Sequence, residues 1–381
     1  MGGGLGLVGL GVMGENLARN IASKGYSLTV YNRTREKTDK LVSSVKNILD
    51  IRPSYSLVEL VEKLEKPRQI VLMVEAGKAV ETVFDELLPL LSPGDVVFDC
   101  GNSFFRDTER RQQTASGRGV LFMGVGVSGG EEGALKGPSI MVGGPRQGYD
   151  VSENLWKAIA AKADGESCAG YMGSAGSGHF VKMVHNGIEY ALLQLIAETY
   201  DILHRGLGLA TEEVGDVFRE WSRGMLSSYL LEIAADALRY RDEETGKPLV
   251  ELVLDKAEQK GTGRWTVQTA AELGVPTPSI DAAVSARNIS ALKETRVLAA
   301  RKHNITLKKL LDEGLAEMLH DAYLCSAVVS YVQGLHLIDR GSKTYGYGTV
   351  LDEVLKVWRN GCIIRAALLK DLRRAIAENG D

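Results

Sequence analysis

Cysteine is scarce in this sequence. The four cysteines, Cys100, Cys168, Cys325 and Cys362, lie far apart and form no CxxC or CxxxC pair. This spacing argues against a disulfide framework and against a cysteine-based zinc site, and it fits buried thiols in a reducing cytosol. We therefore expect no metal site and a cytoplasmic protein.

A strong excess of charge of one sign is also missing. The net charge is -4 and the sequence pI is near 6.0, so the chain as a whole does not attract nucleic acids or anionic lipids. The apolar stretch MGGGLGLVGLGVMG has no basic leader and reaches Glu15 too soon for a signal peptide or a membrane span. We expect neither a nucleic-acid partner nor a membrane partner.

What the sequence does contain is enough apolar residues for two domains. The chain has 381 residues, of which 44% are hydrophobic. Over residues 4–145, short β-rich runs such as LGLVGL and QIVLMV alternate with helical stretches at 13–24, 77–91 and 106–117. This alternation predicts a parallel sheet that is covered by helices on both faces.

From residue 176 onward the β-rich runs nearly vanish. Residues 176–205 predict one helix of thirty residues that ends at Gly206 and Gly208. Further helices are expected at about 211–240, 263–273, 279–302, 306–338 and 349–379. We therefore predict an α/β domain over residues 1–175 and an all-α helical domain over residues 176–381.

A glycine-rich turn follows the first expected strand. In GLGVMG, the glycines stand between a strand and a helix, where backbone N–H groups and the positive end of the helix dipole can meet a pyrophosphate. We predict a Rossmann-like nucleotide-binding domain whose loop contacts the cofactor through Gly9, Leu10, Gly11, Val12, Met13 and Gly14. A second formal match, GVGVSG at 124–129, starts no new βαβ unit, and we reject it as a dinucleotide site.

The residues after the second expected strand indicate which dinucleotide binds. An NAD site usually has Asp or Glu about twenty residues past the glycine loop, but this strand ends in Asn32, Arg33 and Thr34. Arg33 can stack on adenine and pair with a 2′-phosphate, and Lys37 adds positive charge, so NADP is favoured. In the alternative interpretation these residues only turn the chain, and Thr34 caps the next helix.

A single row of polar groups marks the long helix. Lys182, His185, Asn186 and Glu189 fall at i, i+3, i+4 and i+7 along one face, and apolar residues cover the other sides. Two structural interpretations are a solvated face and a polar network between helices. The functional interpretation is a cleft where this helix meets the nucleotide-binding domain. Gly187 supports it, because its missing side chain permits close approach although it costs up to ~1 kcal/mol of helix propensity.

Lys182 has the chemistry of a general base if it is buried. Burial disfavours the charged ammonium, so its pKa is expected to fall from about 10.4 toward the ~7–8 that suits a base. Beside a nicotinamide, a neutral Lys182 could take the proton of a hydroxyl while carbon gives up hydride. Glu189, two turns along, is placed to act as a separate acid.

Four further segments are candidates for the substrate site. The GVSGG turn offers backbone N–H groups to a carboxylate, and GNSFF ends another strand at the same sheet edge. KGTGRWT and the later DAAVSARNISALK offer basic groups to a phosphate. Each also has a structural interpretation as a turn, a helix N-terminus or an ion-pair partner. The residues are Asn102, Ser128, Gly129, Gly130, Lys260, Thr262 and Arg287.

Together these motifs resemble the 6-phosphogluconate dehydrogenase family within the wider β-hydroxyacid dehydrogenases. The match runs through GLGVMG, NRT, GNSFF, GVSGGEEGALKGPSIM, GHFVKMVHNGIEY, KGTGRWT and VWRNGCIIR, nearly the whole chain. The resemblance implies a Rossmann domain, a helical domain that forms a homodimer, and oxidation of 6-phospho-D-gluconate to ribulose 5-phosphate and CO2 with NADP.

The resemblance also implies roles for single residues. Lys182 is expected to accept a proton, Glu189 to donate one to the enediol left after decarboxylation, and Asn186 to belong to the catalytic group with them. The substrate site is expected to contain Asn102, Ser128, Gly129, Gly130, His185, Asn186, Tyr190, Lys260, Thr262 and Arg287. The cofactor is expected to contact Val74, Glu75, Ala76 and Asn102 as well as the glycine loop.

The sequence departs from the family pattern in two places. Glu75 stands where the family commonly has lysine, so NADP binding is expected to weaken or to shift toward NAD. The sequence stops at Asp381, whereas the family continues with a tail that supplies an arginine and a histidine to the neighbouring subunit. We therefore expect either a shortened chain or a natural variant whose phosphate contacts rest on Lys260 and Arg287.

Two other functions stay open. A β-hydroxyacid dehydrogenase for a small acid without phosphate would share the glycine loop, Ser128 and Lys182, although KGTGRWT and Arg287 argue against it. An NADP-binding dimer module with little turnover would bind the cofactor and release no CO2.

Overall fold

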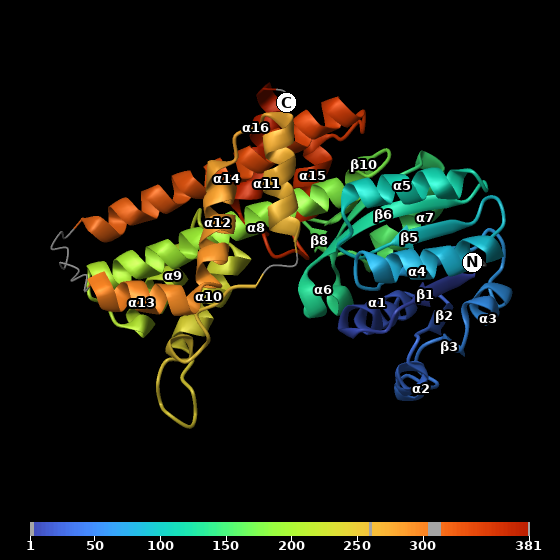
Figure 1. The fold of residues 1–381 in the computed structure, drawn as a ribbon, viewed down its shortest axis with the longest axis horizontal. Coiled ribbons are helices and arrows are strands. Elements are labelled where there is room, and N and C mark those ends of the chain that lie inside the picture. The colour runs from blue at the N-terminus through green and yellow to red at the C-terminus, as the bar shows by residue number, and fades with distance from the viewer. Residues whose placement is uncertain (1–3, 259–260, 304–313, 380–381) are drawn as a thin grey trace. The chain divides into compact units, whose positions relative to one another are not determined.

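The computed structural model describes residues 4–258, 261–303 and 314–379, which form two compact units (Figure 1). Unit 1 contains the described residues of Met1–Met183, Ile338–Ile363 and Ala375–Asp381. Unit 2 contains those of Val184–Leu337 and Ile364–Arg374. The predicted domain boundary near residue 175 stays a prediction. None of the described helices has both the length and the hydropathy needed to cross a membrane.

Unit 1 is built on an eight-stranded sheet with the order β10-β7-β6-β5-β4-β1-β2-β3. The parallel sheet is confirmed for the six strands from β6 to β3, but β7 runs antiparallel to β6, and β10 pairs parallel with β7. The strands are Leu5–Val8 (β1), Leu28–Tyr31 (β2), Ile51–Ser54 (β3), Gln69–Leu72 (β4), Val96–Asp99 (β5), Leu121–Ser128 (β6), Ser139–Gly143 (β7) and Ala169–Gly173 (β10). A separate small hairpin joins β8 (Lys162–Ala163) to β9 (Glu166–Ser167).

Three strands of this sheet were not predicted from the sequence. β3 has the sequence IRPS, in which proline and arginine hide the β signal at a sheet edge. β7 and β10 are short and glycine-containing, SIMVG and AGYMG, so they lack the long β-branched runs of the central strands.

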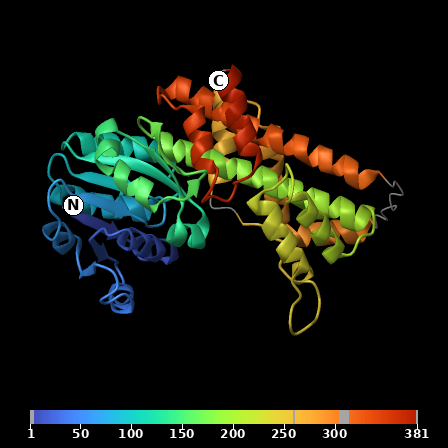
Figure 2. The same cartoon turned by 180° about the vertical axis from the view of Figure 1, so that it is seen from behind.

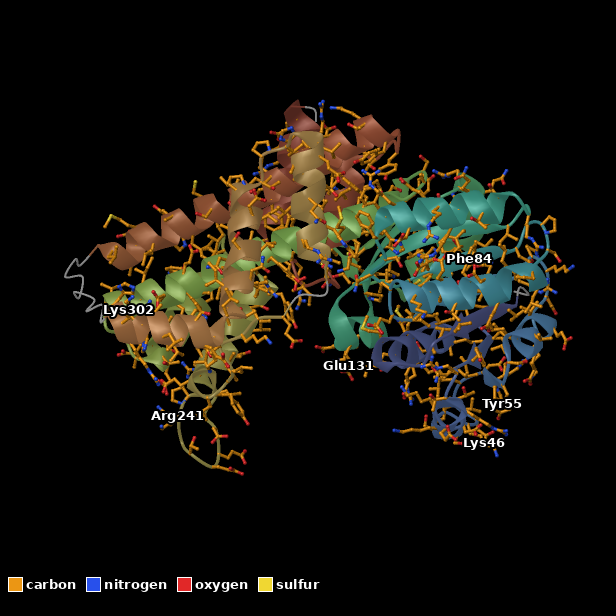
Figure 3. The ribbon with its side chains drawn as sticks, in the orientation of Figure 1. Lys46, Tyr55, Phe84, Glu131, Arg241 and Lys302 are labelled. Carbon is orange, nitrogen blue, oxygen red and sulfur yellow. The ribbon has the colours of Figure 1, made fainter. Side chains whose placement is uncertain are left out.

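Helices cover both faces of the sheet, as the alternation predicts. One buried cluster packs α1, α2 and α7 against the strands, and the other packs α3, α4 and α5 against the opposite face. Figure 1 shows α4 and α5 in front of the strands, Figure 2 shows the sheet from behind, and Figure 3 labels Phe84 of α4. The helices are Val12–Ser23 (α1), Arg35–Ser44 (α2), Leu57–Glu62 (α3), Lys78–Leu87 (α4), Phe105–Ser116 (α5), Gly130–Lys136 (α6) and Arg146–Ile159 (α7).

The second half of the chain is helical, as predicted. The long helix α8 spans Ser177–Asp201 and continues as a π-helical turn, Ile202–Gly206, close to the predicted end. The others are Thr211–Trp221 (α9), Tyr229–Arg239 (α10), Thr262–Leu273 (α11), Pro278–Ser290 (α12), Lys293–His303 (α13), Leu315–Tyr345 (α14), Leu351–Trp358 (α15) and Leu368–Asn379 (α16).

Three of the predicted helices are each two helices in the structure. The predicted 211–240 divides into α9 and α10, 279–302 into α12 and α13, and 349–379 into α15 and α16. Between α9 and α10, Gly224 lies in the turn, and the Ser228 hydroxyl then caps α10 by accepting the Leu231 N–H at 3.4 Å. The apolar period continues through such breaks, which is why pattern alone did not reveal them.

Glycines allow α8 and α14 to pack closely. In unit 1, a Cβ on Gly341 would clash with the ring of Phe180. In unit 2, a Cβ on Gly334 would clash with Ile188. Both apolar partners on α8 are fully buried, so the apolar sides of the long helix are packed as predicted.

Candidate active site

The carboxyl ends of neighbouring strands carry most of the site residues predicted in unit 1. β1, β4, β5 and β6 are adjacent and parallel, so the loops that follow them open on one edge of the sheet. The chain order reverses between β4 and β1. Such a reversal is where open α/β sheets bind ligands.

The first glycine loop joins β1 to α1 at this reversal. Gly9 has a φ of +101°, and a Cβ there would clash with the backbone oxygen of Met73 in the loop after β4. A Cβ on Gly14 would clash with the Gly9 oxygen, whereas one on Gly11 would have no described neighbour within 4 Å. Gly9 and Gly14 therefore permit tight packing, and Gly11 leaves room for a pyrophosphate at the helix N-terminus.

The end of β2 is hydrogen-bonded to the glycine loop through Asn32. Its Oδ1 accepts the Leu10 N–H at 2.8 Å, and its Nδ2 donates to the Thr34 carbonyl at 3.1 Å. Arg33 is exposed next to it, and the exposed Val12 and half-buried Met13 complete the loop. Thr34 is the N-cap of α2 by position, but its side chain makes no capping hydrogen bond to a described residue. The predicted N-cap position is thus confirmed, but the capping hydrogen bond expected from the Thr34 side chain is not formed with a described residue.

The loops after β4 and β5 pack against each other. A Cβ on Gly101 would lie 3.0 Å from the Val74 carbonyl oxygen. Glu75 and Asn102 are exposed, and Val74 and Ala76 are partly buried. The structure therefore brings the predicted cofactor segment and Asn102 together beside the glycine loop.

Two glycines on β6 make room for α8. A Cβ on Gly124 would lie 2.9 Å from Nδ1 of His179, and a Cβ on Gly126 would lie 2.5 Å from the Cβ of Lys182. Because side chains alternate along a strand, these glycines and Ser128 share one face of β6. Ser128 is 2% exposed and Lys182 is 6% exposed. The segment that we rejected as a dinucleotide loop is thus the surface on which Lys182 lies.

The turn after β6 has the backbone that its glycines predict. Gly129 and Gly130 have φ values of +111° and +62°. A Cβ on Gly129 would clash with the carbonyl oxygen of Gly361, which comes from the VWRNGCIIR segment. Glu131, labelled in Figure 3, follows on α6 and is exposed.

The rest of the polar row on α8 belongs to unit 2. His185 is fully buried and Asn186 is 9% exposed, and His185 Nδ1 lies 3.1 Å from Asn186 Oδ1. Glu189 is partly exposed. A Cβ on Gly187 would lie 2.7 Å from Thr266 Cγ2, so the missing side chain permits the close approach of α11, whereas the predicted approach to the nucleotide-binding domain stays a prediction. The interpretation of the row as a solvated face is wrong for Lys182, His185 and Asn186.

Unit 2 brings two of the predicted phosphate-site segments, those of Thr262 and Arg287, to the ring of Tyr190. The guanidinium of Arg287 stacks on the ring of Tyr190, with its carbon 3.6 Å from the ring centroid. A Cβ on Gly263 would lie 2.5 Å from that ring, which places the start of α11, with the buried Thr262, beside Tyr190. Lys260 lies outside the described residues.

Several residues that hold this region in place were not predicted from the sequence. Gly124 and Gly126 had a signal, because glycine inside a strand often marks close approach of another backbone. The buried polar residues Asp99, Arg111 and His179 had none, since each sits in a run that also fits an ordinary strand or helix.

Two family models together match nearly all of the chain. The NAD binding domain of 6-phosphogluconate dehydrogenase matches residues 4–173, and the C-terminal domain of 6-phosphogluconate dehydrogenase matches residues 178–381. The chain belongs to the 6-phosphogluconate dehydrogenase family.

Relatives within the 6-phosphogluconate dehydrogenase family are similar over almost the full chain. The decarboxylating 6-phosphogluconate dehydrogenase of Synechococcus elongatus is 49% identical over 375 residues, 97% of this chain and 80% of the relative. The NADP(+)-dependent, decarboxylating enzyme of Bacillus subtilis is 48% identical over 374 residues, with the same two shares. The expected family and fold class are confirmed.

A solved structure supports the same family. Plasmodium falciparum 6-phosphogluconate dehydrogenase, described in its apo form and in complex with NADP+ and with 6-phosphogluconate, matches with a TM-score of 0.95 and 39% identity. The match covers 99% of this chain and 82% of that one.

Proposed function

We propose that this chain catalyses the NADP-dependent oxidation and decarboxylation of 6-phospho-D-gluconate to D-ribulose 5-phosphate and CO2. The observation that carries the proposal is the position of Lys182, which is buried and packs against Gly126, on the face of β6 that also carries Ser128. Family membership and the decarboxylating relatives support the same reaction.

The cofactor assignment rests on the loop after β1 and on the end of β2. Gly11 leaves space at the N-terminus of α1, and exposed Arg33 stands where an NAD site has a carboxylate. These residues fit NADP, with the pyrophosphate at the loop and the 2′-phosphate at Arg33. When bound, NADP accepts the hydride that leaves carbon 3 of the substrate.

Lys182 acts first as a base and then as an acid in this proposal. Burial disfavours the ammonium form, so the neutral amine takes the proton of the 3-hydroxyl as hydride leaves the same carbon. The product is a β-keto acid, which loses CO2 when Lys182 returns a proton to the developing enolate oxygen. Glu189, seven residues further along α8, then protonates carbon 1 of the enediol while Lys182 takes the proton of the enol hydroxyl on carbon 2, which gives ribulose 5-phosphate.

The remaining predicted residues orient the substrate. Ser128, Gly129 and Gly130 provide the turn for the carboxylate, and Asn102, His185 and Asn186 provide hydrogen bonds to the hydroxyls. Thr262, Tyr190 and Arg287 surround the phosphate in this proposal, which is supported by the stacking of Arg287 on Tyr190 and by the close approach of Gly263, next to Thr262, to the same ring. Lys260 belongs to the same proposal by its position in KGTGRWT.

We also propose that the chain forms a homodimer through its helical part and works in the cytoplasm. Unit 2 exposes large apolar side chains, and such surface often marks a protein interface. They include Met225, Ile233, Leu252, Val253, Leu254, Leu298, Met318 and Val332. The four free cysteines suit a reducing compartment.

Steady-state kinetics with Lys182→Met test the proposal. The wild type is expected to reduce NADP and release CO2 with 6-phosphogluconate but not with 3-hydroxyisobutyrate. Removing the base is expected to lower kcat by ~10²–10⁴-fold, while Lys157→Met, which changes an exposed lysine on α7, leaves kcat unchanged. Wild-type turnover in Lys182→Met would refute its role. NADP binding without any CO2 release would favour the low-activity module.

A further inference from the structure

Asp99 is a buried carboxylate that the proposed mechanism does not use. It ends β5 and is 0% exposed. Its Oδ1 accepts the Gly101 N–H at 3.0 Å, and its Oδ2 accepts the Ser103 hydroxyl at 2.6 Å. Gly101 and Ser103 are the two neighbours of Asn102, which is itself exposed. One carboxylate thus holds the chain on both sides of the predicted site residue.

Arg111 connects this carboxylate to the loop after β4. It lies on α5 and is 1% exposed, and its Nη1 is 3.5 Å from Asp99 Oδ2. Its Nε donates to Glu81 Oε2 at 3.0 Å, and its Nη2 is 2.9 Å from the same oxygen. Glu81 is in the first turn of α4, and Nη2 also reaches the Gly77 carbonyl at 3.5 Å. The chain Asp99–Arg111–Glu81 therefore joins the loop at 74–77 to the loop at 100–104.

Stability alone is a poor explanation for these buried charges. Removing two ions from water costs about as much as their attraction returns, and apolar replacements often do as well. A buried, hydrogen-bonded carboxylate does fix the orientation of the groups around it, because each of its oxygens accepts from a particular donor. Here it fixes the orientation of the backbone around Asn102.

We propose that Asp99 is a positioning residue, which with Arg111 and Glu81 holds Asn102 in place against residues 74–76. This inference rests on the proposed function, in which Asn102 contacts substrate and cofactor. Displacing a positioned group by 1 Å can cost ~10²-fold in rate. Asp99 itself touches neither reactant and acts through its neighbours.

The test compares two buried aspartates at opposite ends of the same strand. Asp99→Asn keeps one acceptor oxygen, but it removes the charge that faces Arg111 and one of the two acceptors. The matched control is Asp95→Asn. Asp95 is 1% exposed, accepts the Arg68 N–H at 2.8 Å, and pairs with Arg68 Nη1 at 2.9 Å. It precedes β5, at the edge away from the site.

Both substitutions are expected to lower Tm, but only Asp99→Asn is expected to change the site. For Asp99→Asn we expect kcat/KM for 6-phosphogluconate to fall by ~10–100-fold and amide hydrogen exchange over residues 100–104 to accelerate. For Asp95→Asn we expect kinetics within about twofold of wild type and unchanged exchange in that segment. All rates are compared well below the lower Tm.

Equal kinetics and equal exchange in the two variants would overturn the proposal. If Asp99→Asn does not fold, Ser103→Ala replaces it, because it removes only the bond to Oδ2; it is expected to show the same two changes at smaller size, and wild-type behaviour would again overturn the idea. If the wild-type enzyme does not turn over 6-phosphogluconate, the proposed function fails. The exchange experiment then still decides whether Asp99 orders residues 100–104.

Discussion

Gly126→Ala is the substitution that most directly probes how Lys182 is seated. The added methyl would lie 2.5 Å from the Cβ of Lys182 and 3.0 Å from the Gly178 carbonyl oxygen. Carbon atoms pack at about 3.5–4.0 Å, so α8 or β6 must move by about 1 Å. Neither contact atom is the end of a flexible side chain, so the backbone has to move.

The loss of stability from overpacking is partly offset by the lower conformational entropy of the unfolded alanine variant. Overpacking of this kind costs about 1–3 kcal/mol, and replacing glycine by alanine returns ~0.4–1 kcal/mol by restricting the unfolded chain. We expect a net loss of ~1–2 kcal/mol in the free energy of unfolding. A 1 Å displacement of Lys182 is expected to lower kcat by ~10²-fold.

The assay is NADP reduction together with thermal unfolding, with Gly6→Ala as the matched control. Gly6 is also buried in a central strand, β1, but its added methyl would meet the flexible end of Leu64 at 2.9 Å, which can move aside. The control is expected to keep kcat. A Gly126→Ala enzyme with normal kcat and a lowered Tm would show that catalysis does not depend on the seat of Lys182.

Three other predictions follow from the structure. Arg33→Ala should raise KM for NADP by ~10–100-fold, through loss of about 1.5–3 kcal/mol of charge-assisted contact. It should leave KM for NAD nearly unchanged, and an equal rise in both KM values would refute the proposed contact between Arg33 and the 2′-phosphate. Burial lowers the pKa of His179 from its ordinary 6.5, against the opposing charge of Asp99. Below pH 6.5 the unfolded chain then binds a proton that the folded protein does not, so the free energy of unfolding should fall by about 1.4 kcal/mol per pH unit until the folded pKa is reached. Urea titrations from pH 7 to 5 measure this dependence, and the free energy of unfolding should change less steeply with pH in His179→Gln than in the wild type. Gly187→Ala should force α8 and α11 apart, because its methyl would lie 2.7 Å from Thr266 Cγ2, and should raise KM for 6-phosphogluconate more than KM for NADP; the opposite ranking would contradict the grouping of Thr262 with the substrate.

The features that sequence predicted best were those with a strong local pattern. The glycine motif from Gly9 to Gly14 joins β1 to the first turn of α1, because glycine spacing and flanking periodicity agree there. α8 follows from an uninterrupted apolar run whose polar residues fall on one face. The burial of Lys182, His185 and Asn186 could be predicted for the same reason, since the flanking residues leave no solvent side.

The features that sequence did not predict depend on contacts between distant segments. β7 and β10 form strands because neighbours complete their ladders, and their own composition is weak. The contacts of Asp99 and Arg111 form only where β5, α4 and α5 pack together, and no periodic pattern in the sequence indicates that packing. Gly124 and Gly126 fall between these cases, because their alternation was visible but their partner on α8 was fifty or more residues away.

Both compact units share helices. The division passes through α8 between Met183 and Val184, through α14 between Leu337 and Ile338, and through α16 between Arg374 and Ala375. Lys182 and His185 therefore fall on opposite sides of the division within one hydrogen-bonded turn of helix. A fragment that kept the whole of unit 1 would have to end inside a helix at each of these three points, so exchanging unit 1 with that of another dehydrogenase would require joining the chains within helices and not at a single linker.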